Sequence, residues 1–336
     1  MIKNFNKYKI SVALCTYNGE SYLSEQLESI IKQTLPSDEI IVCDDCSTDS
    51  TLKILNEFSK ISSVPLKIYM NEKNLGVSKN FEKAISLCTG DIIFLSDQDD
   101  LWFPEKIEKV IEVFNRNKSC SYVFSDAYVV DEHLHSLGYT MWESISFSKR
   151  QRGSFKRGFQ LDILLKHNVV TGATMAFRLE LRKIILPIPK IWTHDAYIAL
   201  LGSILGKGCF IEEPLIYYRQ HNYQLIGGKK YGVVDKSKKA LLIGASDYLL
   251  EKQRFETLNY RVLKLTGKDN NIFGGKIYHL EQRAKINESS NLFNFKKVIF
   301  GLLSGRYFKY SSGFESVAKD IFVISKNLIR KILKKR

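Results

Sequence analysis

The first 125 residues alternate short apolar runs with amphipathic helical patterns, and this alternation constrains the fold more than any other feature of the chain. The helical segments space apolar residues three and four apart, as at Leu23, Leu27 and Ile30, whereas the run Ile92–Leu95 is wholly apolar. A strand that is apolar on both faces is typical of the centre of a parallel sheet. We therefore predict an α/β fold with an open, mostly parallel sheet flanked by helices. The expected strands are residues 10–15, 39–43, 66–70, 92–95 and 120–124.

Charge divides the chain into two parts. Residues 1–225 hold 26 Lys and Arg against 27 Asp and Glu, a net charge of −1, whereas residues 226–336 hold 24 against 9, a net charge of +15. We predict one main domain over 1–225, with halves at about 1–125 and 126–225, followed by a basic, mainly helical region over 226–336. The second half of the main domain includes two expected short strands, 209–212 and 215–219.

Several classes of protein are disfavoured by what the sequence lacks. No Gly-rich loop leads into a helix to hold phosphate, which argues against Walker-type nucleotidases and dinucleotide dehydrogenases. No zinc finger, helix-turn-helix or RNA-binding signature is visible, so nucleic acid is not an expected partner. The apolar runs at 10–15 and 298–303 are too short for a signal peptide or a membrane span. The six cysteines mostly lie in apolar runs and fit a reduced interior, so a cytoplasmic location is expected.

Polar clusters follow three of the expected strands: Thr16-Tyr17-Asn18, Asp44-Asp45 and Asp97-Gln98-Asp99-Asp100. In open parallel sheets ligands bind at the carboxyl ends of the strands. Carboxylates there, together with the oxygens of a substrate diphosphate, can hold a hard divalent cation, Mg²⁺ or Mn²⁺. We predict Asp97 and Asp99 as its ligands, and the alternative is a solvated acidic turn. Asp45 can accept the imino hydrogen bond of a pyrimidine base and Tyr17 can stack on that base. The alternative makes Asp44 a cap or turn residue and Tyr17 part of the core.

Four ordered segments together resemble the signatures of family 2 glycosyltransferases, which have the GT-A fold. They are Ser11 to Asn18, Val42 to Asp49, Asn74 to Ser78 and Leu95 to Asp100. The resemblance covers about residues 8–225 and implies a nucleotide-diphosphate sugar as the donor. It implies that Asp45 contacts the base and that Asp97 and Asp99 contact the ribose and the metal. The residues expected to bind the nucleotide sugar are Thr16, Tyr17, Asn18, Glu20, Asp45, Asn74, Gly76, Asp97 and Gln98.

The Ser-Asp-Gln-Asp-Asp-Leu-Trp segment, with the later Thr-His-Asp and Tyr-Arg-Gln-His-Asn, is most similar to the bacterial rhamnosyltransferase-like branch. That resemblance implies transfer of L-rhamnose from dTDP-L-rhamnose to a cell-envelope glycan or a polyprenyl-diphosphate-linked acceptor. A UDP-hexose donor is one alternative, and a non-catalytic scaffold subunit of a glycan-assembly complex is another.

An inverting transfer needs a base to take the proton of the acceptor hydroxyl. The family places an aspartate at the start of a late helix, which the resemblance assigns to Asp195, and the alternative role for this residue is a helix N-cap. His221 is a candidate for holding the metal or the diphosphate. The residues expected on the acceptor or donor side are Trp102, Thr171, Gly172, His194 and Arg219.

The C-terminal segment 321–336 has an apolar helical face that includes Ile321, Ile324 and Leu328, and its other face is rich in Lys and Arg. Such a helix can lie in a membrane interface. We therefore expect the basic helix to bind an anionic membrane surface and to hold the protein at the inner face of the cell membrane. The alternatives are a solvated face and an oligomer contact, such as a homodimer interface.

Overall fold

The computed structural model describes residues 8–221, 232, 235, 241–267, 271–288 and 291–333. Three features of the sequence analysis lie outside this part: residue 222, residues 334–336 and the predicted boundary near residue 225. The chain forms two compact units. Unit 1 comprises Met1–Gln160 and Val169–Lys230, and unit 2 comprises Leu161–Asn168 and Tyr231–Arg336. None of the helices in the described ranges is long and apolar enough to cross a membrane.

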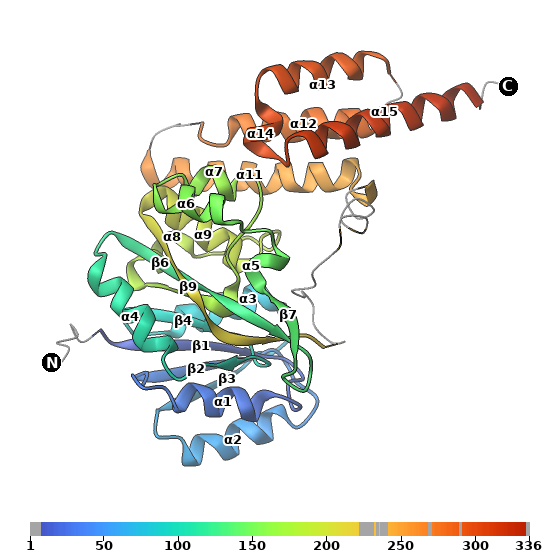
Figure 1. The fold of residues 1–336 in the computed structure, drawn as a ribbon. Coiled ribbons are helices and arrows are strands. Elements are labelled where there is room, and N and C mark those ends of the chain that lie inside the picture. The colour runs from blue at the N-terminus through green and yellow to red at the C-terminus, as the bar shows by residue number, and fades with distance from the viewer. Residues whose placement is uncertain are drawn as a thin grey trace. The chain divides into compact units, whose positions relative to one another are not determined.

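Unit 1 is built on one nine-stranded sheet in the order β3-β2-β1-β4-β8-β6-β9-β5, with β7 paired to β6 (Figure 1). The first four strands along this path are parallel, as predicted, and β8 then inserts antiparallel between β4 and β6. The α/β class is confirmed, but the sheet as a whole is mixed. The strands are β1 Ile10–Thr16, β2 Glu39–Asp44, β3 Leu66–Met70, β4 Ile92–Ser96, β5 Leu101–Trp102, β6 Cys120–Val130, β7 Ser136–Thr140, β8 Met175–Arg178 and β9 Lys207–Arg219.

Helices cover this sheet because each offers one apolar face. In α4 the residues Ile107, Val110 and Phe114 are buried at the spacing of successive turns. Figure 1 shows α1 and α2 on one side of β1–β3 and α3 on the other. The helices of unit 1 are α1 Leu23–Ile31, α2 Thr51–Ile61, α3 Val77–Leu87, α4 Lys106–Arg116, α5 Met141–Ser144, α6 Lys149–Lys156, α8 Arg182–Ile185 and α9 His194–Leu205, with 3₁₀ turns η1 Gly172–Thr174 and η2 Leu179–Leu181. The short helix α7 (Gln160–Leu164) begins at the last residue before the unit 2 segment Leu161–Asn168.

One local prediction is wrong. The two short strands expected at 209–212 and 215–219 are a single strand, β9, which pairs in parallel with β6. Pro214 lies opposite Asp126, where the register between the strands shifts. Proline has no N–H to donate, so it is accommodated at such an irregularity without ending the strand.

Unit 2 contains the helices α11 Ala245–Thr266, α12 Gly274–Glu288, α13 Phe293–Leu303, α14 Arg306–Tyr310 and α15 Phe314–Leu333. The predicted helical C-terminal region is therefore confirmed. A small apolar cluster of Ile286, Val298, Tyr307, Val317 and Ile324 joins α12 to α15. Arg283 donates two hydrogen bonds of 2.9 Å to the fully buried carboxylate of Asp320, which also accepts one from the Tyr307 hydroxyl at 2.7 Å. This paired charge fixes α12 against α15.

Candidate functional site

The three polar clusters meet at one edge of the sheet because the strands that carry them are parallel neighbours. Thr16 lies beside Asp44 in the β1–β2 pairing, and Leu14 lies beside Ser96 in the β1–β4 pairing. Asp44 is fully buried and accepts hydrogen bonds from Thr16 Oγ1 at 2.8 Å and from the Ser47 amide at 2.9 Å. Asp44 is therefore a turn residue, as the alternative interpretation expected, and it holds the loop after β2 against the loop after β1.

Asp45 follows Asp44 and organises the loop after β3. Its carboxylate accepts hydrogen bonds from the amides of Leu75 at 2.7 Å and Gly76 at 2.9 Å, and from Asn71 Nδ2 at 2.7 Å. Gly76 has a φ of +79°, a conformation that costs glycine little. Asn74 Nδ2 donates to the Asp45 carbonyl at 3.3 Å. Asp45, Asn74 and Gly76, three predicted nucleotide contacts, therefore form one hydrogen-bonded group.

Gln98 lies in the loop after β4 and clamps the loop after β1 through two hydrogen bonds. Its side chain accepts a hydrogen bond from the Tyr17 amide at 2.8 Å and donates one to the Tyr17 carbonyl at 3.0 Å. A Cβ on Gly19 would lie 2.3 Å from Gln98 Oε1, so the absence of a side chain there makes room for the clamp. The Tyr17 side chain is 49% exposed, so the alternative that placed it in the core is wrong.

Asn18 and Glu20 join the same loop to the start of α2. Asn18 Oδ1 accepts a hydrogen bond from the Thr48 amide at 2.8 Å, and Glu20 Oε2 accepts one from the Ser50 amide at 2.9 Å. Both predicted nucleotide residues thus shape the loop that carries Tyr17.

The aspartates after β4 stand in an acidic, poorly solvated environment. Burial, with Asp99 and Asp195 nearby, raises the pKa of Asp97 to about 7. Burial also raises the pKa of Asp100 well above its ordinary value and lowers the pKa of the fully buried Lys106 well below its own. Lys106 acts to lower the pKa of both aspartates, but burial outweighs this attraction, and Lys106 Nζ donates a hydrogen bond to the Ala173 carbonyl at 2.7 Å. No sequence signal distinguished Lys106 from the apolar residues of α4.

Asp99 connects this loop to the end of β9. Its Oδ2 lies 2.8 Å from Nε2 of His221, and both side chains are largely buried. Arg219 lies two residues before His221. Its guanidinium donates hydrogen bonds to the carbonyls of Asp99 at 2.9 Å and Glu132 at 2.6 Å, and it also pairs with the Glu25 carboxylate. The Arg219 guanidinium therefore holds the loop after β4. Glu25 was not predicted, because its role depends on a partner nearly two hundred residues away.

Within the part of the chain that the structure describes, no group of three or more His, Cys, Asp and Glu side chains is arranged to hold a metal ion. The predicted ligands come together only as the Asp99–His221 pair, with Asp97 close enough to Asp99 for its pKa to respond. A cation here would need further ligands, such as the diphosphate oxygens of a substrate.

Asp195 reaches this cluster from α9. The N-cap of α9 is Thr193, so the alternative that made Asp195 the N-cap is wrong. Asp195 lies in the first turn, where its Oδ1 accepts the Ala196 amide at 2.6 Å, and its charge raises the pKa of Asp97. Gly76 occupies the N-cap of α3, and Ser78 Oγ donates to the Trp192 carbonyl at 2.9 Å. That bond ties the segment before Asp195 to α3.

His194 and Gly172 pack together beside Asp195. The His194 ring stacks on Phe81 with centroids 4.0 Å apart, and neither ring nitrogen has a hydrogen-bond partner among the described residues. A Cβ on Gly172 would lie 2.6 Å from His194 Nε2. Thr171 precedes this contact, and its carbonyl accepts the Thr174 amide at 3.0 Å. Trp102 was expected on the acceptor or donor side, but its side chain is buried. The Lys106 ammonium lies 3.5 Å from the Trp102 ring centroid, so Trp102 belongs to the packing beneath the cluster.

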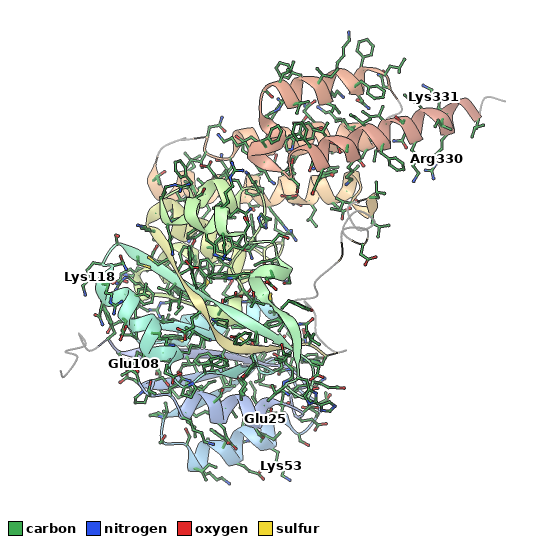
Figure 2. The ribbon with its side chains drawn as sticks, viewed as in Figure 1. Glu25, Lys53, Glu108, Lys118, Arg330 and Lys331 are labelled. Atoms are coloured by element: carbon green, nitrogen blue, oxygen red, sulfur yellow. The ribbon has the colours of Figure 1, made fainter. Side chains whose placement is uncertain are left out.

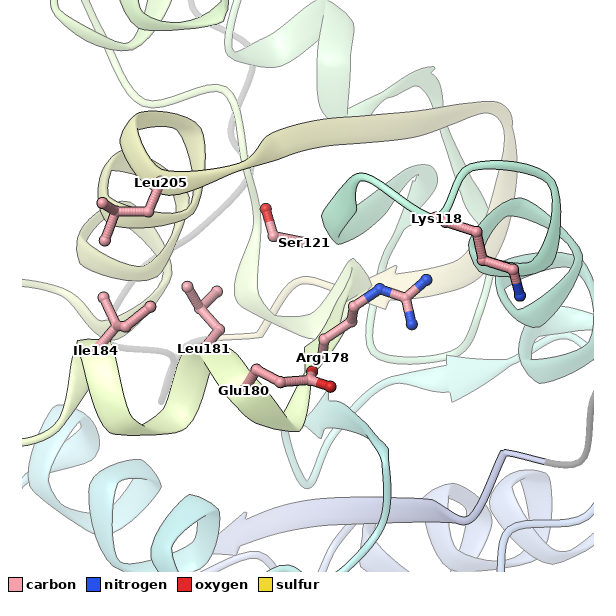
Figure 3. A pocket seen from close by; sticks show the side chains of 7 residues that line it. All are labelled: Lys118, Ser121, Arg178, Glu180, Leu181, Ile184 and Leu205. Carbon is pink, nitrogen blue, oxygen red and sulfur yellow. The ribbon is translucent and has the colours of Figure 1, made fainter.

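A hollow of about 340 Å³ lies elsewhere in unit 1 (Figure 3). Ser121 near the start of β6, Arg178 at the end of β8 and Leu205 at the end of α9 contribute to its lining. Because β8 runs antiparallel to β4 and β6, this hollow is at the opposite edge of the sheet from the acidic cluster. None of the predicted site residues lines it.

An α/β sheet with acidic loops at the carboxyl ends of its parallel strands is the arrangement of GT-A proteins. The chain belongs to glycosyl transferase family 2, whose family model matches residues 11–184. The predicted family and the predicted GT-A fold are therefore confirmed.

Two relatives from Bacillus subtilis (strain 168) match part of the chain. Identity is 36% over 124 residues with the putative glycosyltransferase EpsE, covering 37% of this chain and 45% of that protein. Identity is 32% over 134 residues with the putative teichuronic acid biosynthesis glycosyltransferase TuaG, covering 38% and 52%. The chain thus matches about half the length of these relatives.

Solved structures share the fold over nearly the whole chain. S. aureus TarS 1-349 in complex with UDP-GlcNAc has a TM-score of 0.55 at 18% identity, covering 94% of this chain and 90% of that one. The mannosyltransferase PcManGT from Pyrobaculum calidifontis, in complex with GDP-Man and Mn²⁺, has a TM-score of 0.50 at 15% identity, covering 96% and 87%. At these identities the likeness shows the fold alone.

Proposed function

We propose that this chain is an inverting glycosyltransferase that moves a sugar from a nucleotide-diphosphate donor to an acceptor hydroxyl. The observation that carries the proposal is the convergence of Asp45, Asp97, Asp99 and Asp195 at one sheet edge in a family 2 fold. Asp45 orders the loop that would hold the base, the Asp97–Asp99 loop faces the ribose and diphosphate, and Asp195 stands beside it as the base.

The transfer is a displacement at the anomeric carbon. Asp195 takes the proton of the acceptor hydroxyl as its oxygen forms a bond to that carbon, and the bond from the same carbon to the diphosphate breaks with inversion. The nucleoside diphosphate leaves with the electron pair. The position of Asp195 in the first turn of α9, near enough to Asp97 to raise its pKa, supports this role.

We propose that a divalent cation binds beside the Asp97–Asp99 loop and that the diphosphate oxygens of the donor complete its ligands. Asp99 and His221 offer a carboxylate oxygen and an imidazole nitrogen, and Asp97 offers a second carboxylate from the same loop. Oxygen-rich donor sets of this kind suit Mg²⁺ or Mn²⁺. When bound, the metal would offset the negative charge that develops on the departing diphosphate. PcManGT, which shares the fold, is described in complex with GDP-Man and Mn²⁺. Mn²⁺ is therefore the first metal to test.

The proposed donor is dTDP-L-rhamnose, and the proposed acceptor is a cell-envelope glycan or a polyprenyl-diphosphate-linked oligosaccharide. The sequence resemblance to the rhamnosyltransferase-like branch supports this donor. A UDP-sugar is the second candidate, because TarS, which shares the fold, is described in complex with UDP-GlcNAc.

A donor screen tests both candidates. Purified protein would be mixed with UDP-, GDP- and dTDP-sugars, with and without Mn²⁺, and its thermal stabilisation and donor hydrolysis measured. Stabilisation and hydrolysis specific to dTDP-L-rhamnose support the proposal. A preference for a UDP-hexose would change the proposed donor and leave the proposed reaction unchanged. Binding of no nucleotide sugar would favour a non-catalytic scaffold.

The basic C-terminal region supports a location at the inner face of the cell membrane. Residues 226–336 carry a net charge of +15, which favours an anionic lipid surface, where a lipid-linked acceptor would be presented. We propose that this region brings the enzyme to its acceptor.

A further inference from the structure

Helix α13 of unit 2 turns a row of large apolar side chains outward. It buries Asn294, Val298 and Gly301 within the unit. The opposite side carries residues spaced three, four and seven apart, which place them along one face of the helix. We call this set the α13 apolar face: Leu292, Phe293, Ile299, Phe300 and Leu303, which are 57% to 81% exposed. Contiguous exposed apolar side chains of this size mark an interaction surface.

The chain segment that carries the α13 apolar face, between Glu288 and Glu315, is basic. Residues 289–314 contain four Lys and Arg and no Asp or Glu. The Lys296 ammonium lies 5.1 Å from the Phe293 ring centroid, and the Arg306 guanidinium lies 5.1 Å from that of Phe300. Long basic side chains beside apolar surface can keep their charges in a polar layer while their stems cover apolar atoms. An apolar face flanked by cations would match a partner that has an apolar layer beneath an anionic layer.

The structure also changes the role expected of the last helix. Ile324, on the predicted membrane-facing stripe of α15, is fully buried in the cluster with Val298 and Val317, and Leu328 packs against that cluster. Ile324 and Leu328 therefore face the helical bundle, whereas Ile321 and Leu333 of the same stripe are 41% and 65% exposed. α15 also presents charge: Lys326, Arg330 and Lys331 are exposed, and Figure 2 shows the last two near its C-terminal end.

We propose that the α13 apolar face docks on an anionic lipid bilayer and inserts at the boundary between headgroups and acyl chains. This inference rests on the membrane association proposed above and assigns it to a surface. An 11-residue helix is too short to span a bilayer, but one with an apolar face and flanking cations can lie in its interface. A second copy of the chain fits less well. A two-fold contact through this face would bring the cations of both copies together, with no carboxylate in residues 289–314 to pair with them.

Vesicle flotation of the full chain tests the proposal. The protein would be mixed with vesicles of phosphatidylcholine alone or with added phosphatidylglycerol, without nucleotide sugar. We expect binding only to the anionic vesicles, and a loss of at least about tenfold in Phe300→Ser/Leu303→Ser. Ile61→Ser is the matched control, because Ile61 is 77% exposed on α2 of unit 1, and it should bind like the wild type. Lys296→Gln/Lys309→Gln should weaken binding by about fivefold per cation removed.

Three results would overturn the proposal: a wild-type protein that floats with neither vesicle, one that floats equally with both, or equal binding by Phe300→Ser/Leu303→Ser with an unchanged thermal unfolding curve. A wild-type dimer that this double substitution dissociates, without vesicle binding, would assign the face to self-association instead. Because no donor is present, vesicle binding by a protein that fails the donor screen leaves this proposal standing and removes the transferase proposal.

Discussion

His221 Nε2 lies 2.8 Å from Asp99 Oδ2 and joins the end of β9 to the acidic loop after β4. We predict that His221→Ala lowers the affinity for Mn²⁺ by about tenfold or more, because removal of one ligand from a site of few protein donors is costly. Isothermal titration with Mn²⁺ and nucleotide measures this change. His133→Ala is the control, since that side chain is 72% exposed, and it should leave the affinity unchanged. Unaltered Mn²⁺ affinity in His221→Ala would remove this residue from the proposed metal site.

Asp195→Asn should abolish transfer and spare donor binding. The amide cannot take the acceptor proton, so we expect kcat to fall by about a thousandfold, while the dissociation constant for the nucleotide changes by less than about twofold. Steady-state transfer assays and calorimetry separate the two effects. Asp162→Asn, at an exposed position of α7, controls for the loss of one negative charge. Transfer at the wild-type rate in Asp195→Asn would assign the base to another residue.

The acidic site was predictable from the sequence in part, because residues that follow parallel strands share one sheet edge wherever the helices lie. Asp45 and Asp97 are such residues, and a pattern of alternating strands and helices is enough to bring them together. Asp99 and His221 were each predicted to hold the metal, but the direct contact between them was not predicted. Lys106 and Glu25 gave no signal, because their roles depend on charges and contacts from distant segments.

Prediction of the fold from the sequence was limited in the same way, because local patterns do not encode long-range contacts. The periodic patterns of the first four strands located β1–β4, since local apolar runs determine them. The insertion of β8 beside β4 depends on long-range pairing that no local pattern encodes. The burial of Ile324 in α15 was missed for a related reason. A helix can have apolar residues on more than one side, and only packing decides that Ile324 faces the bundle while Ile329 stays exposed.

The Gln98 clamp should make Gly19 and Gln98 energetically coupled. Gly19→Ala places a methyl group 2.3 Å from Gln98 Oε1, so the side chain must move and lose its bonds to Tyr17, at a cost of about 1–2 kcal/mol in the free energy of unfolding. Gln98→Ala loses the same bonds. In the double variant Gly19→Ala should add little, because the side chain it displaces is gone. Urea unfolding of the four proteins gives the coupling, and strict additivity would refute it.

Glu39 should make the stability of the chain depend on acid pH. Burial opposes its charge, but hydrogen bonds from Ser11, Lys67 and Thr89 outweigh burial and lower the pKa of Glu39 from 4.5 to about 2. Because the folded pKa lies below the unfolded one, this stabilisation is complete above about pH 4.5 and disappears as the pH falls towards 2.

Glu39→Gln should therefore cost about 2–3 kcal/mol in the free energy of unfolding at pH 7. The difference from the wild type should shrink steadily below about pH 4.5, where the carboxylate of the unfolded wild type becomes protonated. Urea unfolding of both proteins from pH 7 to the lowest pH at which they stay folded measures this difference. Glu28→Gln, at an exposed pair with Lys32, is the matched control and should follow the wild type within about 0.5 kcal/mol. A difference between Glu39→Gln and the wild type that stays constant with pH would mean that Glu39 acts through packing and not through its charge.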